Sequence, residues 1–370
     1  MIAELARVFL RLGAVSFGGP AAHIALMHYE FVEKRRWLSE QEFLDLVGAT
    51  NLIPGPNSTE MAIHIGFRRA GWPGLIVAGA CFILPAVIIV GVLAALYVTY
   101  GARPQAQAVF YGVKPVVIAI VGVALWKLAH TAIKMPWHAG LAIAAIVASA
   151  AGVNELALLA ACGTIAGIVS GFGRSWLNRA PLMFVTPFAT VATLPAITAV
   201  SMSGLFVVFL KAGGLLFGSG YVLLAFLRAD LVERLHWLTE QQLMDAIAIG
   251  QVTPGPVFTT ATFVGYQLGG VTGAAIATVA IFLPAFVYVA ISGPLLPHLR
   301  RSPFASGAID GVNIASLALM AVVTWHLGRS AVVDVTTITL AVLSVIALSR
   351  RVNPTWLIAA GALVGTLSGM

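Results

Sequence analysis

The sequence predicts an all-α polytopic membrane protein made of two homologous halves. Hydrophobic residues make up 59 % of the 370 residues and charged residues only 9 %, against about 25 % charged in a typical soluble domain. The same Pro-Gly-Pro triplet also interrupts an apolar segment twice, at 54–56 and 254–256. Together these observations indicate a duplicated membrane fold with broken helices.

Long uncharged runs give the membrane segments. Leu75–Tyr100 has no charged residue over 26 positions, which is enough to cross a hydrocarbon core of about 30 Å with some tilt. Basic residues fall in short groups between the runs, as topology determinants do. The predicted segments of the first half are Ile2–Met27, Phe43–Phe67, Leu75–Tyr100, Ala106–Leu128, Ala139–Ala151 and Leu156–Ile168. Those of the second half are Leu205–Leu227, Leu243–Tyr266, Val271–Leu296, Phe304–Leu327, Val332–Leu348 and Trp356–Gly369.

The duplication is visible within the single sequence. Shifting residues 9–56 by 200 positions superposes 16 identical residues in 48, and a shift of 199 continues the register after one residue is lost. Many of the identities fall on Gly, Pro, Trp and Asp, which seldom match by accident at a fixed register. We therefore predict a first repeat at 1–171, a connecting segment at 172–200 and a second repeat at 201–370.

The Pro-Gly-Pro triplets are predicted to break helices at membrane depth. Ser39 and Glu42 fit a capping box, and a helix from there to Leu52 has 13 residues, about 20 Å at about 1.5 Å per residue. Such a helix is too short to cross, and broken helices are tolerated where they line a cavity or a site. Further breaks at 18–19 and 218–220 correspond to each other. Paired interruptions of this kind point to the binding site of a secondary transporter.

Half-helix N-termini at these breaks favour an anion. Their N–H groups lack acceptors and carry about half a positive charge, so four converging breaks suit a dianion. Unwound carbonyls and helix C-termini leave a cation open. The predicted substrate-binding residues are Gly18, Gly19, His23, Asn51, Pro54, Gly55, Pro56, Asn57, Ser58, Thr59, Gly218, Ser219, Gly220, Pro254, Gly255, Pro256, Thr259 and Thr260.

An ordered set of motifs resembles the CHR (chromate ion transporter) family. The motifs are Phe17-Gly18-Gly19-Pro20 with His23, Glu33-Lys-Arg-Arg-Trp37-Leu38, Pro54-Gly55-Pro56, Gly71-Trp72-Pro73-Gly74 and Gly112-Val113-Lys114-Pro115. The match covers nearly the whole chain. The resemblance implies a two-domain inner-membrane protein that exports chromate, a sulfate-shaped dianion, and confers chromate resistance. It also implies that the two halves are inserted in opposite orientations.

The second half departs from the first at several motif positions. The replacements are Val257 for Asn57, Phe258 for Ser58, Thr260 for Glu60 and Asn313 for Lys114. The two half-sites are therefore not chemically equivalent, and we expect the first half to supply most of the side-chain chemistry. Opposite orientation needs an odd number of crossings between equivalent segments. Either 182–202 also crosses the membrane or one broken segment is re-entrant.

Three titratable residues are predicted to couple or gate the movement: Glu60, His23 and His64. Intramembrane ionisable groups are functional by default, and His titrates near physiological pH. The alternative for Glu60 is a capping box with Asn57 at the N-cap. For His23 the alternative is a hydrogen-bonded contact between helices, and for His64 a place near the water interface.

Three cations are predicted to add positive potential near the site: Arg11, Lys114 and Lys211. The alternative for Arg11 and Lys211 is anchoring at lipid headgroups, and for Lys114 it is snorkelling to the interface. Asp45 and Asp245 lie in the second turn of their helices, where an acid complements the helix dipole. We expect a structural role for both acids.

Other function classes find little support in the sequence. The histidines show no metal-ligand spacing, the two cysteines stand alone, and no catalytic triad or phosphate-binding loop is recognisable. We therefore expect no metal, cofactor or catalytic residue, and no enzyme activity. The scattered basic groups form no continuous nucleic-acid face.

The sequence thus predicts a multi-pass inner (plasma) membrane transporter for chromate or a sulfate-like anion. Since no nucleotide-binding motif is present, the energy would come from an ion or proton gradient or from anion exchange. Its expected partners are the anion and membrane lipids, with a homodimer left open and no nucleic acid. The alternatives are a transporter of sulfate or another oxyanion, a passive anion channel and an intramembrane enzyme.

Overall fold

The structure is a computed structural model that describes residues 1–17, 19–172, 200–216, 220–350 and 352–368, and every regular element in these ranges is a helix. The helices of the first half are α1 (Ile2–Val15), α2 (Pro20–His28), η1 (Tyr29–Lys34), α3 (Glu40–Thr50), α4 (Asn57–Tyr100), α5 (Pro104–Ala132), α6 (Pro136–Ala150) and α7 (Glu155–Phe172). Those of the second half are α8 (Met202–Leu215), η3 (Gly220–Val222), α9 (Leu223–Leu227), η4 (Arg228–Arg234), α10 (Glu240–Val252), η5 (Val257–Thr259), α11 (Thr260–Arg301), α12 (Pro303–Ala331), α13 (Val335–Ser349) and α14 (Pro354–Ser368).

Equivalent helices begin and turn at equivalent residues in the two halves. α5 begins at Pro104 and α12 at Pro303, in agreement with the shift of 199. α4 and α11 each turn at a glycine with a left-handed backbone, Gly71 at φ 58° and Gly270 at φ 60°. The predicted two-half helical fold is confirmed. The predicted division at 1–171, 172–200 and 201–370 stays a prediction, because residues 173–199 lie outside the described ranges.

The first two apolar segments of the first half fold back as hairpins. α1 runs antiparallel to α2 and η1, since Arg11 Nη2 lies 2.7 Å from Glu30 Oε2. α3 runs antiparallel to the first turns of α4, since Glu42 at the start of α3 pairs with Arg68 at 3.2 Å. The glycine break and the Pro-Gly-Pro break therefore lie at hairpin tips. Hairpins of this shape are compatible with re-entrant segments; the alternative, a crossing by 182–202, falls largely outside the described residues, so the choice between the two stays a prediction.

The long helix α4 is itself two helices packed back to back. Its backbone leaves the helical region at Ala70–Gly71. A Cβ atom built on Gly66 would touch Gly74 and Ala78, so the segments before and after the turn lie in contact. α11 turns in the same way at 269–270. The predicted segments end and restart at these turns, between Phe67 and Leu75 in the first half and between Tyr266 and Val271 in the second.

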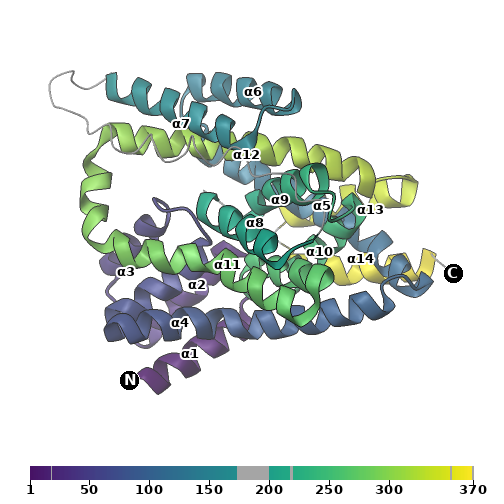
Figure 1. Ribbon diagram of the computed structural model, residues 1–370, viewed down its shortest axis with the longest axis horizontal. Coiled ribbons are helices and arrows are strands. Elements are labelled where there is room, and N and C mark those ends of the chain that lie inside the picture. The colour runs from purple at the N-terminus through teal and green to yellow at the C-terminus, as the bar shows by residue number, and fades with distance from the viewer. Residues whose placement is uncertain (18, 173–199, 217–219, 351, 369–370) are drawn as a thin grey trace.

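The two halves run antiparallel and exchange helices. In Figure 1 the long segments of α4 and α11 run in opposite directions, and Gly79 of one packs on Phe286 of the other. The hairpin of α6 and α7 packs on α12 of the second half, while α13 and α14 pack on α5 of the first. Gly112 permits the second of these contacts, since its Cα lies directly against Gly361 and Gly365. The inverted repeat is thus intertwined.

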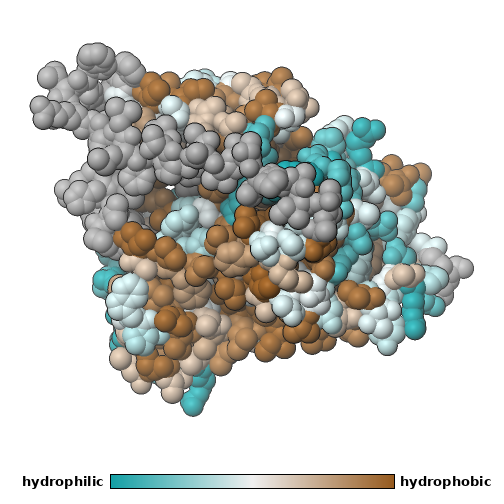
Figure 2. Space-filling model, in the orientation of Figure 1, coloured by the Kyte–Doolittle hydropathy of each residue, from teal (hydrophilic) through white to brown (hydrophobic). Residues whose placement is uncertain are grey.

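Four helices of the described ranges are long and apolar enough to cross a membrane by length and composition: Asn57–Tyr100, Pro104–Ala132, Val257–Ile291 and Pro303–Ala331. α4 presents Ile76, Leu84, Ile88 and Val92 outward, and Figure 2 shows hydrophobic residues gathered over α4 and α11. An exposed apolar face of this extent fits a surface covered by lipid.

Candidate functional site

The first Pro-Gly-Pro break is a sharp tip between α3 and α4. The predicted capping box of Ser39 and Glu42 starts α3, and the helix ends at Thr50, two residues before the predicted end. Gly55 adopts φ 139°, a backbone angle at which any residue with a side chain would be strained. Its N–H donates to the carbonyl of Leu216 at the end of α8, with an N–O distance of 2.7 Å.

The second Pro-Gly-Pro break makes the equivalent contact with the first half. Gly255 adopts φ 92°, and its N–H donates to the Ser16 carbonyl at 2.8 Å. Ser16 and Leu216 are equivalent under the shift of 200, as are the two glycines. A reciprocal contact of this kind defines a two-fold pseudosymmetry. Each Pro-Gly-Pro tip therefore meets the glycine-rich break of the opposite half, and its own glycine amide is already bonded.

His23 and Ser16 form a buried polar pair at the second of these meeting points. Their side chains are 1 % and 3 % exposed. His23 Nε2 lies 3.1 Å from the Ser16 carbonyl oxygen, which assigns the proton to Nε2. His23 Nδ1 and Ser16 Oγ have no hydrogen-bond partner within the described part of the chain. His23 is therefore hydrogen-bonded through one ring nitrogen, as the alternative reading expected, while the other ring nitrogen has no partner among the described residues.

Thr59 and Glu60 form a second buried polar pair, in the first turn of α4. Both are 0 % exposed. Neither the Thr59 hydroxyl nor either Glu60 carboxylate oxygen has a partner among the described residues. The N-cap of α4 is Pro56, so the capping-box alternative for Glu60 is not realised. The carboxylate packs instead against Gly55 at the hairpin tip.

Glu60 begins a line of polar residues on one face of α4. His64 and Arg68 follow at spacings of four residues, which places all three side by side along the helix. His64 is 6 % exposed, and its Nε2 has no partner in the described ranges. Arg68 is partly exposed and pairs with Glu42. The line leads from the buried carboxylate to the surface.

Most of the other first-half candidates lie at the same tip, whereas Gly19 belongs to the glycine break that meets the second tip. Asn57 Nδ2 donates to Asn51 Oδ1 at 2.8 Å, so the two amides bridge the break, and Ser58 is buried. The N–H groups of Thr59 and Glu60 donate to the Pro56 carbonyl, whereas by helix geometry those of Asn57 and Ser58 have no intrahelical acceptor. Gly19, with φ 81°, precedes α2. Pro54 is half-buried and Pro56 buried.

The second-half candidates offer fewer free groups. The Thr259 hydroxyl donates to the Pro256 carbonyl at 2.8 Å and the Thr260 hydroxyl to the Val257 carbonyl at 2.8 Å. Pro254 is buried, and Gly220 begins η3. Three predicted site residues lie outside the described residues: Gly18, Gly218 and Ser219. Among the described residues, the polar groups without partners at the hairpin tips belong mainly to the first half.

The predicted supporting cations are each paired with a carboxylate. Arg11 pairs with Glu30, which is 1 % exposed. Lys211 lies 2.9 Å from Asp230. Glu30 and Asp230 were not singled out from the sequence, although they occupy equivalent positions opposite equivalent cations. An acid that aligns with an acid in the other half, 19 residues after an aligned cation in each, was the signal that would have found them.

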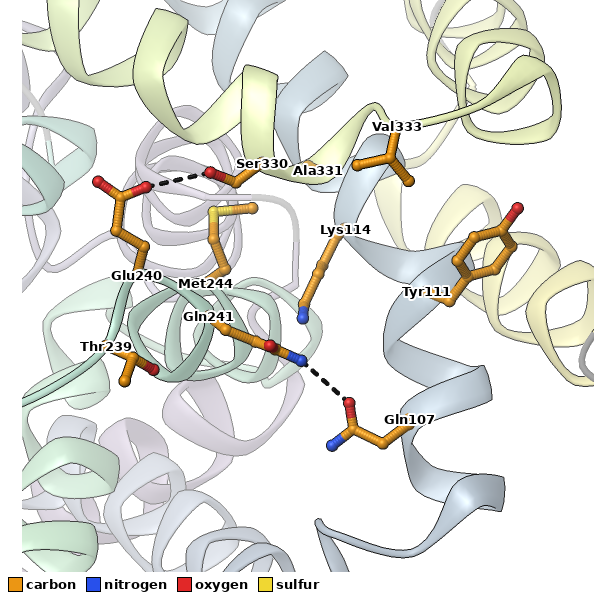
Figure 3. Close-up of a pocket in the computed structure, with 10 residues that line it drawn as sticks. All are labelled: Gln107, Tyr111, Lys114, Thr239, Glu240, Gln241, Met244, Ser330, Ala331 and Val333. Carbon is orange, nitrogen blue, oxygen red and sulfur yellow. Dashed lines mark hydrogen bonds between the residues drawn. The ribbon is translucent and has the colours of Figure 1, made fainter.

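Lys114 pairs with Asp245 at 2.9 Å, across the two halves. It also lines a cavity of about 610 Å³ between α5, α10 and the end of α12 (Figure 3). The cavity contains none of the hairpin-tip residues. In the described ranges, no group of three or more His, Cys, Asp or Glu side chains is placed to hold a metal ion.

Two inverted halves with paired helical hairpins that meet tip to tip have the architecture of a secondary membrane transporter. The chain belongs to the chromate transporter family, since the family model described as chromate transporter matches residues 3–168 and 203–366. These two matched ranges agree with the two halves.

Curated relatives support the same family. The chain is 30 % identical to a probable chromate transport protein of Synechococcus elongatus, over 98 % of this chain and 95 % of the relative. It is 30 % identical to a chromate transport protein of Cupriavidus metallidurans, over 99 % and 92 %. It is 32 % identical to one of Pseudomonas aeruginosa, over 87 % and 80 %. No solved structure matches the chain.

Proposed function

We propose that the protein is a secondary transporter that exports chromate from the cytoplasm across the inner membrane. Family membership and the names of the curated relatives support chromate as the cargo. The sequence has no recognisable nucleotide-binding loop. The energy therefore comes from an ion or proton gradient, or from exchange with another anion.

The observation that carries this proposal is the set of buried polar groups without partners at the hairpin tips. Buried polar groups are nearly always hydrogen-bonded, and leaving one unbonded costs about 1–3 kcal/mol. Ser16, His23, Thr59 and Glu60 carry such groups. The two hydroxyls can donate to an anion as they stand, whereas His23 Nδ1 and the Glu60 carboxylate can donate only after taking up a proton. A tetrahedral oxyanion offers acceptors in several directions, which suits hydroxyls and helix N-terminal amides around it.

Electrostatics then makes binding depend on a proton. A dianion and an ionised carboxylate repel strongly at low dielectric, so the anion shares the site with Glu60 only when Glu60 carries a proton. Binding of the anion and binding of the proton are therefore linked at this site. The line from Glu60 through His64 to Arg68 supplies polar groups between the site and the surface. This linkage is the basis on which we assign coupling to Glu60, with His23 and His64 in support.

The test is anion flux in proteoliposomes, with chromate and sulfate each measured with and without an imposed pH gradient. We expect chromate to accumulate against its own gradient only when the pH gradient is present. Glu60→Gln should abolish the response to pH, because the amide neither takes up nor releases a proton in the physiological pH range. Thr260→Val is the matched control, since Thr260 holds the equivalent position and its hydroxyl bonds locally.

Each contrary result removes a defined part of the proposal. A preference for sulfate would change the cargo and leave the site standing. If chromate only moves down its own gradient and never accumulates inside the vesicles above the outside concentration, the protein would be a passive channel. A pH response that persists in Glu60→Gln would exclude Glu60 as the coupling residue.

A further inference from the structure

The exposed face of α3 is polar along most of its length. Gln41, Asp45 and Asn51 are exposed on this face, together with Leu44, which is 53 % exposed. Because residues three, four and seven positions apart share one side of an α-helix, these four side chains line up along α3. The other side of α3 carries its buried residues: Phe43, Leu46, Ala49 and Thr50.

This face continues from the base of the hairpin to its tip. Asn51 lies eleven residues after Glu40, the first residue of α3, which is about 17 Å at about 1.5 Å per residue. That distance is more than half of a hydrocarbon core of about 30 Å. At the inner end, Asn51 Oδ1 accepts from Asn57 Nδ2 at 2.8 Å, at the first Pro-Gly-Pro tip. The exposed polar face therefore leads to the candidate site.

The faces of this protein that suit lipid expose apolar side chains instead. Figure 2 shows hydrophobic residues gathered over α4 and α11, and the outward residues of α4 are Ile76, Leu84, Ile88 and Val92. Ionisable and amide groups inside a membrane face water or the interior of the protein, because contact with hydrocarbon is costly. The exposed Asp45 and Asn51 therefore indicate that water, and not lipid, covers this face of α3.

The equivalent face of α10 in the second half is closed. Met244 is 1 % exposed and Asp245 0 %, and Asp245 lies 2.9 Å from Lys114 of the first half. Gln251, the equivalent of Asn51, is half-buried. The reason is that α10 packs on both α5 and α12, while α3 packs mainly on α4 and lies at the edge of the molecule in Figure 1. The cavity beside α10 contains no hairpin-tip residue, so the polar route to a tip is one-sided.

Basic residues indicate which side of the membrane this route faces. Seven Lys or Arg residues lie in the first-half hairpins, away from the tips: Arg7, Arg11, Lys34, Arg35, Arg36, Arg68 and Arg69. The second-half hairpins, which enter from the opposite side, carry three in the corresponding parts: Lys211, Arg228 and Arg234. An excess of Lys and Arg is typical of the cytoplasmic side. The base of α3 is therefore expected to face the cytoplasm.

We propose that the exposed face of α3 is one wall of a water-filled path, along which the anion reaches the first Pro-Gly-Pro tip from the cytoplasm. This inference rests on the proposed function, since the anion is its cargo. Asp45 is negatively charged, so this part of the face is a route for a dianion and not a place where it binds. The first side chains that can hold the anion are the amides of Asn51 and Asn57, at the inner end of the path.

Single cysteines labelled with a membrane-impermeant maleimide test the proposal. The background replaces the native cysteines, Cys81→Ala and Cys162→Ala, and each variant then adds one cysteine. The variants on the proposed path are Leu44→Cys, Gly48→Cys and Asn51→Cys. Gly48→Cys is a second deep position on the same face, because Asn51→Cys also removes the hydrogen bond to Asn57.

Two kinds of control accompany these variants. The matched positions in the second half are Met244→Cys, Ala248→Cys and Gln251→Cys, which lie on the closed face of α10. The lipid-facing control is Ile88→Cys, because Ile88 is 56 % exposed and Leu44 53 %. Exposure is thus equal in this last comparison, and only the surrounding medium differs. Labelling after denaturation in detergent gives the total thiol of each variant.

We expect the three path variants to react at least about tenfold faster than the controls, because a thiol in apolar surroundings forms little of the reactive thiolate. The fast reaction should occur in inverted membrane vesicles, whose cytoplasmic face is outside. In intact cells, where the reagent reaches only the opposite face, the same variants should react slowly.

Three outcomes would overturn the proposal. Path variants that react as slowly as Ile88→Cys would mean that lipid or protein covers α3. Second-half variants that react as fast as the path variants would mean that the route is not one-sided. A faster reaction in intact cells than in inverted vesicles would place the path on the other side of the membrane. Labelling needs no substrate, so its result is independent of whether chromate is the cargo.

Discussion

The two Pro-Gly-Pro tips share one backbone geometry but differ in chemistry. Each glycine has a left-handed backbone and donates to the opposite half. The first tip is followed by Thr59 and Glu60, whose side-chain oxygens lack partners in the described ranges. At the second tip, Thr259 and Thr260 bond to nearby carbonyls. The two halves thus share the hairpin scaffold, while the side-chain groups without partners at the tips come mainly from the first half in the described ranges.

The largest expected effect tests the shared scaffold. Glu30→Gln and Asp230→Asn each remove the charge of a carboxylate that is at most 2 % exposed and pairs with more than one cation, and breaking a buried ion pair costs up to about 3–5 kcal/mol of stability. The loss should be larger for Asp230→Asn, because Lys211 is 12 % exposed whereas Arg11 is 53 % exposed and can be hydrated when its partner is removed. Thermal unfolding in detergent measures the effect. The control is Glu33→Gln, since Glu33 is 57 % exposed, and a loss as large in this control would contradict the assignment.

The next effect separates the chemistry of the two tips. Thr59→Val removes a hydroxyl that is free to bind the anion, and a hydrogen bond to a charged group is worth about 1.5–3 kcal/mol, or roughly 10- to 100-fold in affinity. Thr259→Val removes a hydroxyl that bonds to the Pro256 carbonyl. Its affinity for chromate should stay near that of the wild type. Equilibrium binding of chromate to both purified variants decides the point, and equal losses would refute the difference between the tips.

A smaller effect concerns the tip geometry. Gly55→Ala forces a side chain onto a left-handed backbone, at a cost of about 1–3 kcal/mol, and pushes against the Glu60 carboxylate. Gly255→Ala carries similar strain but meets Ala86 and the Gly13 carbonyl instead. Both should lower the unfolding temperature. Only Gly55→Ala should also change the pH dependence of flux; an unchanged profile would mean that Glu60 keeps its place.

The smallest effect concerns the helix starts. Ser39→Ala and Thr239→Ala remove the capping boxes of α3 and α10, each worth about 1 kcal/mol. Both should reduce stability without changing anion affinity, as urea unfolding and chromate binding would show. Changed affinity in either variant would mean that the N-terminus of that helix takes part in binding.

Much of the fold follows from local features of the sequence. The duplication, the breaks and the capping boxes depend on Gly, Pro and side-chain caps at fixed positions, and the structure contains all three. The hairpin direction does not follow from such features. That α3 turns back along α4 depends on the tertiary pairing of Glu42 with Arg68. The exchange of α6 and α7 with α13 and α14 is likewise set by packing between distant segments.

The role of the candidate site residues stays a prediction, and the sequence was more informative about which residues to consider than about their partners. The sequence marked Glu60 and His23, and the structure buries both with free polar atoms. It could not assign the partners of Lys114 or Lys211, because Asp245 and Asp230 lie far from them in sequence or on another helix. Periodicity and spacing describe one helix at a time, so ion pairs between helices escape them.

The most direct test is equilibrium binding of radiolabelled chromate to the purified protein in two double variants, one at each Pro-Gly-Pro tip. One is Asn57→Ala with Thr59→Val in the first half, and the other is Thr259→Val with Thr260→Val in the second. The first-half variant should lose at least about tenfold in affinity, the equivalent of one hydrogen bond to a charged group, while the second-half variant should bind like the wild type. Equal losses, or a greater loss in the second-half variant, would contradict a site whose polar chemistry comes from the first half.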